Sequence, residues 1–275
     1  MNSLLRAQDR KRTNEFVCVA KAANMIIKRA STIGVAVLLL CPTIFSDDGL
    51  QLIHKMQKAL GGADKIAAIH EFEQQVRAQS WNGNTGQLIG DVIKRTRWIR
   101  PNYLRVDQVG PGSTYVLYFD GKSGWEILPG TAKVIDIEGG ELTFARGYVR
   151  TFTLNLWLAD RDPSFKISSP STNVVRVQDD VMNSHNDITL DTVSSLPVKV
   201  GSMSAADPAN PIPKEDIVTE WETVQGIRFP RHWIVSRAGL KVAEATLELT
   251  KLNGGLKLED MSKQPSDFKP VLTSR

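Results

Sequence analysis

Cysteine and histidine are scarce in this chain of 275 residues. Both cysteines, Cys18 and Cys41, lie before residue 47. The four histidines stand apart, and no two have the spacing of metal ligands on one helix or hairpin. From residue 47 onward the sequence therefore excludes disulfides, cysteine nucleophiles and cysteine-based zinc sites. We expect no metal and no other cofactor.

Long apolar runs are also missing. The longest, residues 33–45, is shorter than the roughly 20 residues that a membrane-spanning helix needs. Lys28 and Arg29 precede this run, and Asp47 and Asp48 follow it. A basic segment, a short apolar run and a polar boundary, in this order, are typical of a secretory signal peptide.

We interpret residues 1–46 as this signal peptide, cleaved after Ser46, which directs the chain to the periplasm or the outside of the cell. The stretch before the apolar run is long for a signal peptide, whereas a start at Met25 gives an ordinary length. Three alternatives stay open. In the first, the segment is an uncleaved membrane anchor, and in the second it is a buried core helix. In the third, a lipid is attached to Cys41, although Leu40 stands where a lipidation motif has a small residue.

Without residues 1–46, the chain has no large excess of positive or negative charge. The chain has 34 Lys and Arg against 30 Asp and Glu, of which this segment holds seven and two. The net charge therefore changes from +4 to −1. The basic character of the whole sequence gives no argument for a nucleic-acid partner, and we expect none.

After residue 47 the chain begins as a helix and continues as strands. Apolar residues recur at helical spacing over 50–60, with an aspartate pair before them and a glycine pair after them. Residues 63–69 predict a second, short helical turn. Beyond residue 70 the period shifts toward two and turn residues recur, which predicts antiparallel strands paired with their sequence neighbours. We expect strands near 70–81, 86–99, 102–109, 113–120, 123–128, 131–137, 174–178, 187–191, 197–202, 217–223, 226–236 and 240–252.

Two segments interrupt this pattern. Residues 205–213 contain three prolines, which remove backbone donors, so this segment is predicted to be a loop. Residues 141–160 place apolar side chains on one side of a helix of roughly five turns, although β-branched residues weaken the pattern. The sequence after residue 46 thus predicts one mostly β (α+β) domain, residues 47–275, with a few helices.

Three sequence blocks carry a resemblance to a known family. They are ALGGADKIAAI at 59–69, RPNYLRV at 100–106 leading to YFDGKSGW at 118–125, and GIRFP at 226–230. In this order they resemble the outer-membrane lipoprotein-sorting superfamily, the LolA/LolB-like proteins, and especially its uncharacterised exported members. The resemblance implies an unclosed antiparallel β half-barrel, covered by a few helices, whose concave apolar face receives acyl chains.

Seven side chains are candidates for lining such a cavity, and each has packing in a core as its alternative role. They are Trp98, Tyr115, Leu117, Phe119, Trp125, Phe152 and Leu156. Residues 115–119 are apolar on both faces of their strand, which is typical of a sheet covered on both sides. We expect the helix at 141–159 to direct Phe152 and Leu156 toward the sheet as a lid. That hypothesis fails if the segment is a strand or if the sheet face beneath it is tightly filled.

No catalytic motif stands out. The segment Gly121-Lys122-Ser123 lacks the preceding glycine of a phosphate-binding loop, because Val116 occupies that position, and a hairpin turn explains it better. His185 lies in a polar segment that we interpret as a turn, and the serines at 168–171 as a loop. The sequence therefore does not predict an enzyme.

We expect an exported carrier or binder of lipid, lipoprotein acyl chains or another apolar ligand. The alternative is an envelope protein-interaction or sensor module with the same fold, which a filled cavity and an exposed apolar patch would favour. A hydrolase would require perturbed titratable residues that converge in a cleft. The expected partners are a lipid or acyl chain, or an envelope protein, and the expected state is a monomer.

Overall fold

The computed structural model describes residues 48–131, 133–204 and 212–264. The chain divides into two compact units, residues 1–44 and 45–275, and every described residue belongs to the second. The predicted signal peptide, Ser46, Met25 and Cys41 lie outside the described residues. Within the described part of the chain, no helix is long and apolar enough to cross a membrane.

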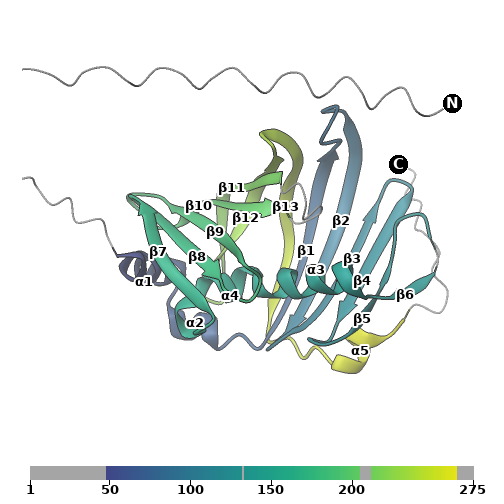
Figure 1. The fold of residues 1–275 in the computed structure, drawn as a ribbon, viewed down its shortest axis with the longest axis horizontal. Coiled ribbons are helices and arrows are strands. Elements are labelled where there is room, and N and C mark those ends of the chain that lie inside the picture. The colour runs from purple at the N-terminus through teal and green to yellow at the C-terminus, as the bar shows by residue number, and fades with distance from the viewer. Residues whose placement is uncertain (1–47, 132, 205–211, 265–275) are drawn as a thin grey trace, which may run out of the picture. The chain divides into compact units, whose positions relative to one another are not determined.

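One antiparallel sheet of 13 strands forms the framework (Figure 1). Its order is β6-β5-β4-β3-β2-β1-β13-β12-β11-β10-β9-β8-β7, so only β1 and β13 pair across a large distance in sequence. The edge strands β6 and β7 do not pair with each other, which leaves the sheet unclosed as predicted. The strands are β1 Glu71–Trp81, β2 Leu88–Ile99, β3 Tyr103–Gly110, β4 Ser113–Phe119, β5 Gly124–Ile127, β6 Val134–Asp136, β7 Phe165–Ser171, β8 Val174–Asp179, β9 Ser184–Leu190, β10 Pro197–Ser204, β11 Ile212–Val224, β12 Ile227–Arg237 and β13 Leu240–Leu252.

The predicted strands are confirmed in kind and order, with three errors. Of the loop predicted over residues 205–213, Ile212 and Pro213 instead begin β11, and residues 205–211 lie outside the described part of the chain. Residues 168–171, predicted to be a loop, belong to β7. This edge strand turns only Phe165 and Ile167 toward the core, too few residues for a visible alternation. His185 lies within β9 and not in a turn, because the strand begins at Ser184.

The first helix forms where the sequence predicts it. In α1, Gly49–Leu60, the Asp48 side chain accepts a hydrogen bond from the Leu50 N–H at 3.3 Å. The helix ends at Gly61, whose φ of 121° suits a residue without a Cβ. The shorter α2, Ala63–Ala67, follows at once.

The predicted helix over 141–159 is interrupted. It is split into α3, Gly139–Arg150, and α4, Thr153–Trp157, and a 3₁₀ turn over Ala159–Arg161 follows. Phe152 is extended, with φ −59° and ψ 137°, and caps α4. The Val149 carbonyl accepts both the Phe152 N–H at 3.1 Å and the Asn155 side-chain amide at 2.7 Å, so two hydrogen bonds meet at the interruption. The interruption turns the Phe152 ring into the core.

We call the face of the sheet that packs against α1, α3 and α4 the inner face, and the opposite one the outer face. A large inner cluster joins α1 and α4 to both halves of the sheet, and a smaller one joins α3 to β3 and β4. A third cluster, of Val116, Trp125 and Ile127, lies on the outer face. The helix α5, Leu258–Ser262, packs against β3 and lies in a segment whose sequence is too polar and too short to reveal it. The predicted covering of β4 on both faces is confirmed.

Candidate functional site

The structure brings six of the seven predicted lining residues to the inner clusters. Trp98, Phe152 and Leu156 belong to the large cluster, and Leu117 and Phe119 to the small one, which Tyr115 contacts. Trp125 lies on the outer face, where its ring is 5.8 Å from that of Tyr118. All seven side chains except Tyr115 are buried. In this conformation they form packed cores.

The inner face beneath α3 is filled with side chains. Leu104, Leu117 and Phe119 are no more than 1% exposed and pack with Ala145 and Val149 of α3. Helix α3 lies where the lid was predicted, but the sheet face beneath it is tightly filled, so the hypothesis of a lid over an open cavity fails. Any ligand that reaches this part of the sheet has to displace α3.

Nearer the β1–β2 hairpin the inner face is less covered. Strand register places Val92, Ala78, Ala245, Trp233 and Val218 side by side across β2, β1, β13, β12 and β11. Ala245 is buried and the other four are half-buried. Figure 1 shows that β1 and β2 extend well beyond α3 and α4 toward the hairpin that joins them. We call the five residues Val92, Ala78, Ala245, Trp233 and Val218 the apolar row.

Beside the apolar row lies a contact between a lysine and a tyrosine. Lys94 follows Val92 on the same face of β2, and its Nζ donates to the Tyr148 Oη of α3 at 2.6 Å. Burial by itself raises the pKa of the Tyr148 phenol, but the Lys94 ammonium and its hydrogen bond outweigh burial, so this pKa is lowered. Lys214 on β11 acts in the same direction. Cations from two strands, with three other strands between them, therefore act on one phenol.

Lys214 has an acidic neighbour. Its Nζ lies 2.5 Å from an Asp216 oxygen, on the same face of β11, with both side chains about 30% exposed. Lys94, in contrast, forms no ion pair among the residues that the structure describes. We call Lys94, Tyr148 and Lys214 the lysine–tyrosine cluster.

The C-terminal end of α3 is tied to β8 by an ion pair. Arg150 Nη2 donates to Asp179 Oδ1 at 2.7 Å and to the Ser164 hydroxyl at 2.8 Å, while Arg150 Nε contacts the other Asp179 oxygen. Asp179 is 1% exposed and also accepts the Val181 N–H at 2.9 Å. This pair holds α3 in its packed position.

A carboxyl group is buried beside α3. Glu126 pairs in register with Leu117, faces inward and is 6% exposed. Burial, and then the charge of Glu141 on α3, raise the pKa of Glu126, although a hydrogen bond from Tyr115 opposes them. Burial and Glu126 together raise the pKa of Tyr115.

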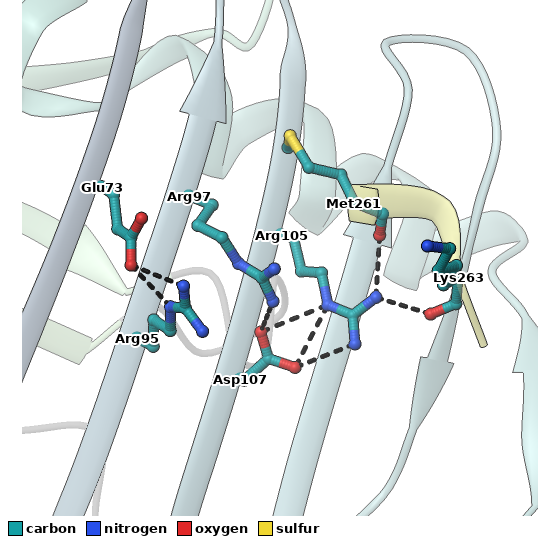
Figure 2. Close-up of polar contacts among 7 residues, drawn as sticks. All are labelled: Glu73, Arg95, Arg97, Arg105, Asp107, Met261 and Lys263. Atoms are coloured by element: carbon teal, nitrogen blue, oxygen red, sulfur yellow. Dashed lines mark hydrogen bonds and ion pairs between the residues drawn. The ribbon is translucent and has the colours of Figure 1, made fainter. Parts of the chain in front are cut away.

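The outer face carries a ladder of charged residues, drawn in Figure 2. Arg95 pairs with Glu73, while Arg97 and Arg105 share Asp107. Arg105 also donates to the carbonyls of Met261 at 2.8 Å and Lys263 at 2.6 Å. The Arg105 side chain, 9% exposed, therefore fastens the end of α5 to β3.

His232, also on the outer face, joins three strands. Its Nδ1 lies 2.6 Å from the Thr219 hydroxyl and its Nε2 lies 3.1 Å from a Glu244 oxygen. Thr219, His232 and Glu244 are therefore ordered like a nucleophile, a base and an orienting acid. The Thr219 hydroxyl, however, also donates to the backbone carbonyl of His232 at 3.1 Å. We interpret the arrangement as a clip between β11, β12 and β13.

Two surface hollows accompany these outer-face groups, and polar side chains make up most of their lining. One, of about 170 Å³, adjoins His232, and the other, of about 450 Å³, lies between the β3–β4 region and α5. No group of three or more potential metal ligands gathers among the described residues. The structure groups the residues of the apolar row and of the lysine–tyrosine cluster, which the sequence did not predict to come together.

Solved structures share this fold. A DUF1329 family protein from Desulfovibrio piger has a TM-score of 0.51 at 12% identity, over 76% of this chain and 93% of its own. A putative outer membrane lipoprotein-sorting protein domain from Vibrio parahaemolyticus has a TM-score of 0.50 at 12% identity, over 78% and 95%. A LolA superfamily protein from Nitrosomonas europaea has a TM-score of 0.51 at 14% identity, over 76% and 97%.

These likenesses confirm the predicted resemblance to LolA-like proteins as a similarity of fold. No protein-family model matches the sequence, and no curated protein is significantly similar to it.

Proposed function

We propose that this protein is an exported, periplasmic or secreted, carrier or binder of an apolar molecule such as a lipid or the acyl chains of a lipoprotein. The observation that carries the proposal is the apolar row, five neighbouring strands with apolar side chains on an inner face that the helices leave partly uncovered. A ligand on this row gains free energy as it removes apolar surface from water. The fold supports the proposal, since the similar structures include a putative lipoprotein-sorting domain.

Six of the seven residues predicted from the sequence then form the deeper part of the site. In the packed conformation α3 covers the small inner cluster. Displacement of α3 about the extended Phe152 exposes Leu117 and Phe119 to an acyl chain, while Trp98 and Leu156 border the same space. Trp125 faces outward and has a structural role in this proposal.

Lipid analysis of the exported protein tests the proposal. The full chain is expressed in an exporting bacterial host, purified without detergent and examined by native mass spectrometry, and its lipids are extracted. We expect about one lipid per chain, and at least tenfold less in Trp233→Glu, which places a charge on the apolar row. The matched control Ile234→Glu alters the neighbouring outer-face position and should leave lipid binding unchanged. The intact mass also tests cleavage after Ser46 and lipid attachment to Cys41.

An apo-protein that also ignores fatty-acid probes would instead support the interaction module. One observation favours this second candidate, because apolar side chains are exposed near the hairpin ends of neighbouring strands. They are Leu88 at 58%, Ile89 at 53%, Met203 at 46%, Ile212 at 41% and Leu240 at 47%. Apolar side chains that are exposed together at one end of the strands are typical of a docking surface for another protein.

A further inference from the structure

Lys94 carries a positive charge that no ion pair with a described acidic residue neutralises. Its side chain is half-buried, and its ammonium donates to a neutral phenol instead of a carboxylate. A lysine that only covers apolar surface extends its ammonium into water. The Lys94 ammonium instead lies against α3, 5.0 Å from the centre of the Tyr148 ring. A partly buried cation without an anion costs free energy, and two of its three N–H donors remain for another acceptor.

Two further cations of the inner face lie on the other side of the apolar row, on β11 and β12. Lys214 also acts on Tyr148, and its one acidic partner is Asp216. Arg237 pairs in register with Lys214 and adds a further cation at the end of β12. Glu126, a buried acid of the inner face, is hydrogen-bonded to Tyr115. This part of the inner face is therefore complementary to an anion.

The apolar row adjoins this cationic region. Val92 and Lys94 share one face of β2, and Val218 and Lys214 share one face of β11. The row crosses five strands, which at the usual strand spacing is about 19 Å, a suitable length for a long acyl chain. An anion site beside an apolar strip matches a ligand with an anionic head and an apolar chain.

We infer that Lys94 and Tyr148 bind the anionic head of an amphipathic ligand whose chain lies along the apolar row, while Lys214, on the other side of the row, adds positive charge to the same face. The head is a carboxylate or a phosphate, since both accept several hydrogen bonds from ammonium and phenol donors. This inference rests on the proposed function and specifies its ligand.

Matched ligands test the head site separately from the chain site. Oleate and oleyl alcohol share one apolar chain, but only oleate carries a charge. We expect the exported full-length protein to bind oleate at least tenfold more tightly than oleyl alcohol, and Lys94→Met with Lys214→Met to remove this preference. Lys199→Met, which removes a lysine from the outer face, is the charge-matched control and should retain it. Circular dichroism and urea unfolding verify that each variant folds.

Two further ligands distinguish the sources of the anion. Tighter binding of lysophosphatidate than of oleate would assign a lipid phosphate, and the reverse order a fatty carboxylate. Binding of inorganic phosphate as tightly as of either amphiphile would overturn the inference in favour of a site for a free anion. Equal binding of oleate by the double variant and the wild type would also overturn it and leave the proposed function intact. If neither oleate nor oleyl alcohol binds, the proposed function itself fails.

The ionisation of Tyr148 supplies an independent signal. An anion beside Lys94 weakens the effect of this ammonium on the phenol, so the pKa of Tyr148 should rise when oleate binds. Ultraviolet titration of tyrosine ionisation measures this change, and Tyr148→Phe assigns the signal. An identical titration with and without bound oleate would place the head group elsewhere.

Discussion

The indole ring of Trp98 and the phenyl ring of Phe152 stack with their centroids 5.4 Å apart and their planes inclined by 26°. Phe152 also meets the edge of Phe72 at 5.4 Å. The chain break between α3 and α4 therefore carries an aromatic anchor in the large inner cluster. This anchor fixes the end of α3 to the large inner cluster.

We expect Phe152→Ala to lower the free energy of unfolding by about 3–5 kcal/mol, because it removes a buried ring from contact with two others. Urea unfolding of the purified protein measures the change. Phe144→Ala is the control on the same segment, since Phe144 is 46% exposed, and it should cost less than about 1 kcal/mol. Similar losses in both variants would mean that the position of Phe152 in the core is not the cause.

The ion pair between Arg150 and Asp179 should be a strong tie for α3. Asp179→Asn leaves the partly buried Arg150 without its counterion, so we expect a loss of about 3 kcal/mol or more in unfolding free energy. Asp180→Asn is the matched control, because Asp180 pairs with a largely exposed Lys166 and should contribute at most about 1 kcal/mol. Hydrogen exchange should show faster exchange in α3 for the first variant alone. Unchanged exchange there would argue that packing, and not this pair, holds the helix.

Glu126 should make stability depend on pH. Because its pKa is raised in the folded protein, its contribution to stability is fully present below the unfolded pKa of about 4.3 and is lost as the pH rises through the folded pKa. Glu126→Gln should therefore be more stable than the wild type at pH 7.5, and the difference should vanish near pH 3.5. Unfolding free energies at the two pH values measure it, with the exposed Glu138→Gln as control. A difference that is the same at both values would rule out ionisation of Glu126 as its source.

Arg105 should hold the C-terminal segment in place. Arg105→Met removes the donors to the carbonyls of Met261 and Lys263, so we expect faster hydrogen exchange and faster tryptic cleavage around α5. Arg95→Met alters an exposed member of the same ladder and should leave both rates unchanged. Wild-type rates in Arg105→Met would show that burial of Met261 is sufficient.

Much of the fold could be predicted from the sequence, because the strand signal is local. Alternation within each strand and turn residues between strands identify most of the strands, and the apolar spacing over 50–60 identifies α1. The interruption at Phe152 was missed because the apolar positions continue through it at helical spacing. The interruption is marked by the extended Phe152 and by the hydrogen bond from the Asn155 side chain to the Val149 carbonyl, neither of which periodicity reveals.

The candidate site was less predictable because it depends on long-range register. The apolar row takes one residue from each of five strands, and two of the five are alanines. Ala78 and Ala245 have polar neighbours on both sides, whereas Val92, Val218 and Trp233 each have one isoleucine neighbour, and only the pairing of β1 with β13 brings the five together. Lys94 and Lys214 are 120 positions apart. The outward position of Trp125 likewise follows from register and not from composition.

The open ends of the sheet have a consequence for self-association. Unpaired strands are templates on which a second copy can add its own strand, and long chains of molecules can grow in this way. Here the two edges are poor templates, because β6 has only three residues and β7 contains Pro170, which lacks an N–H, and the largely exposed Lys166. The sheet can therefore remain unclosed around its inner face without the polymerisation that an unprotected edge invites.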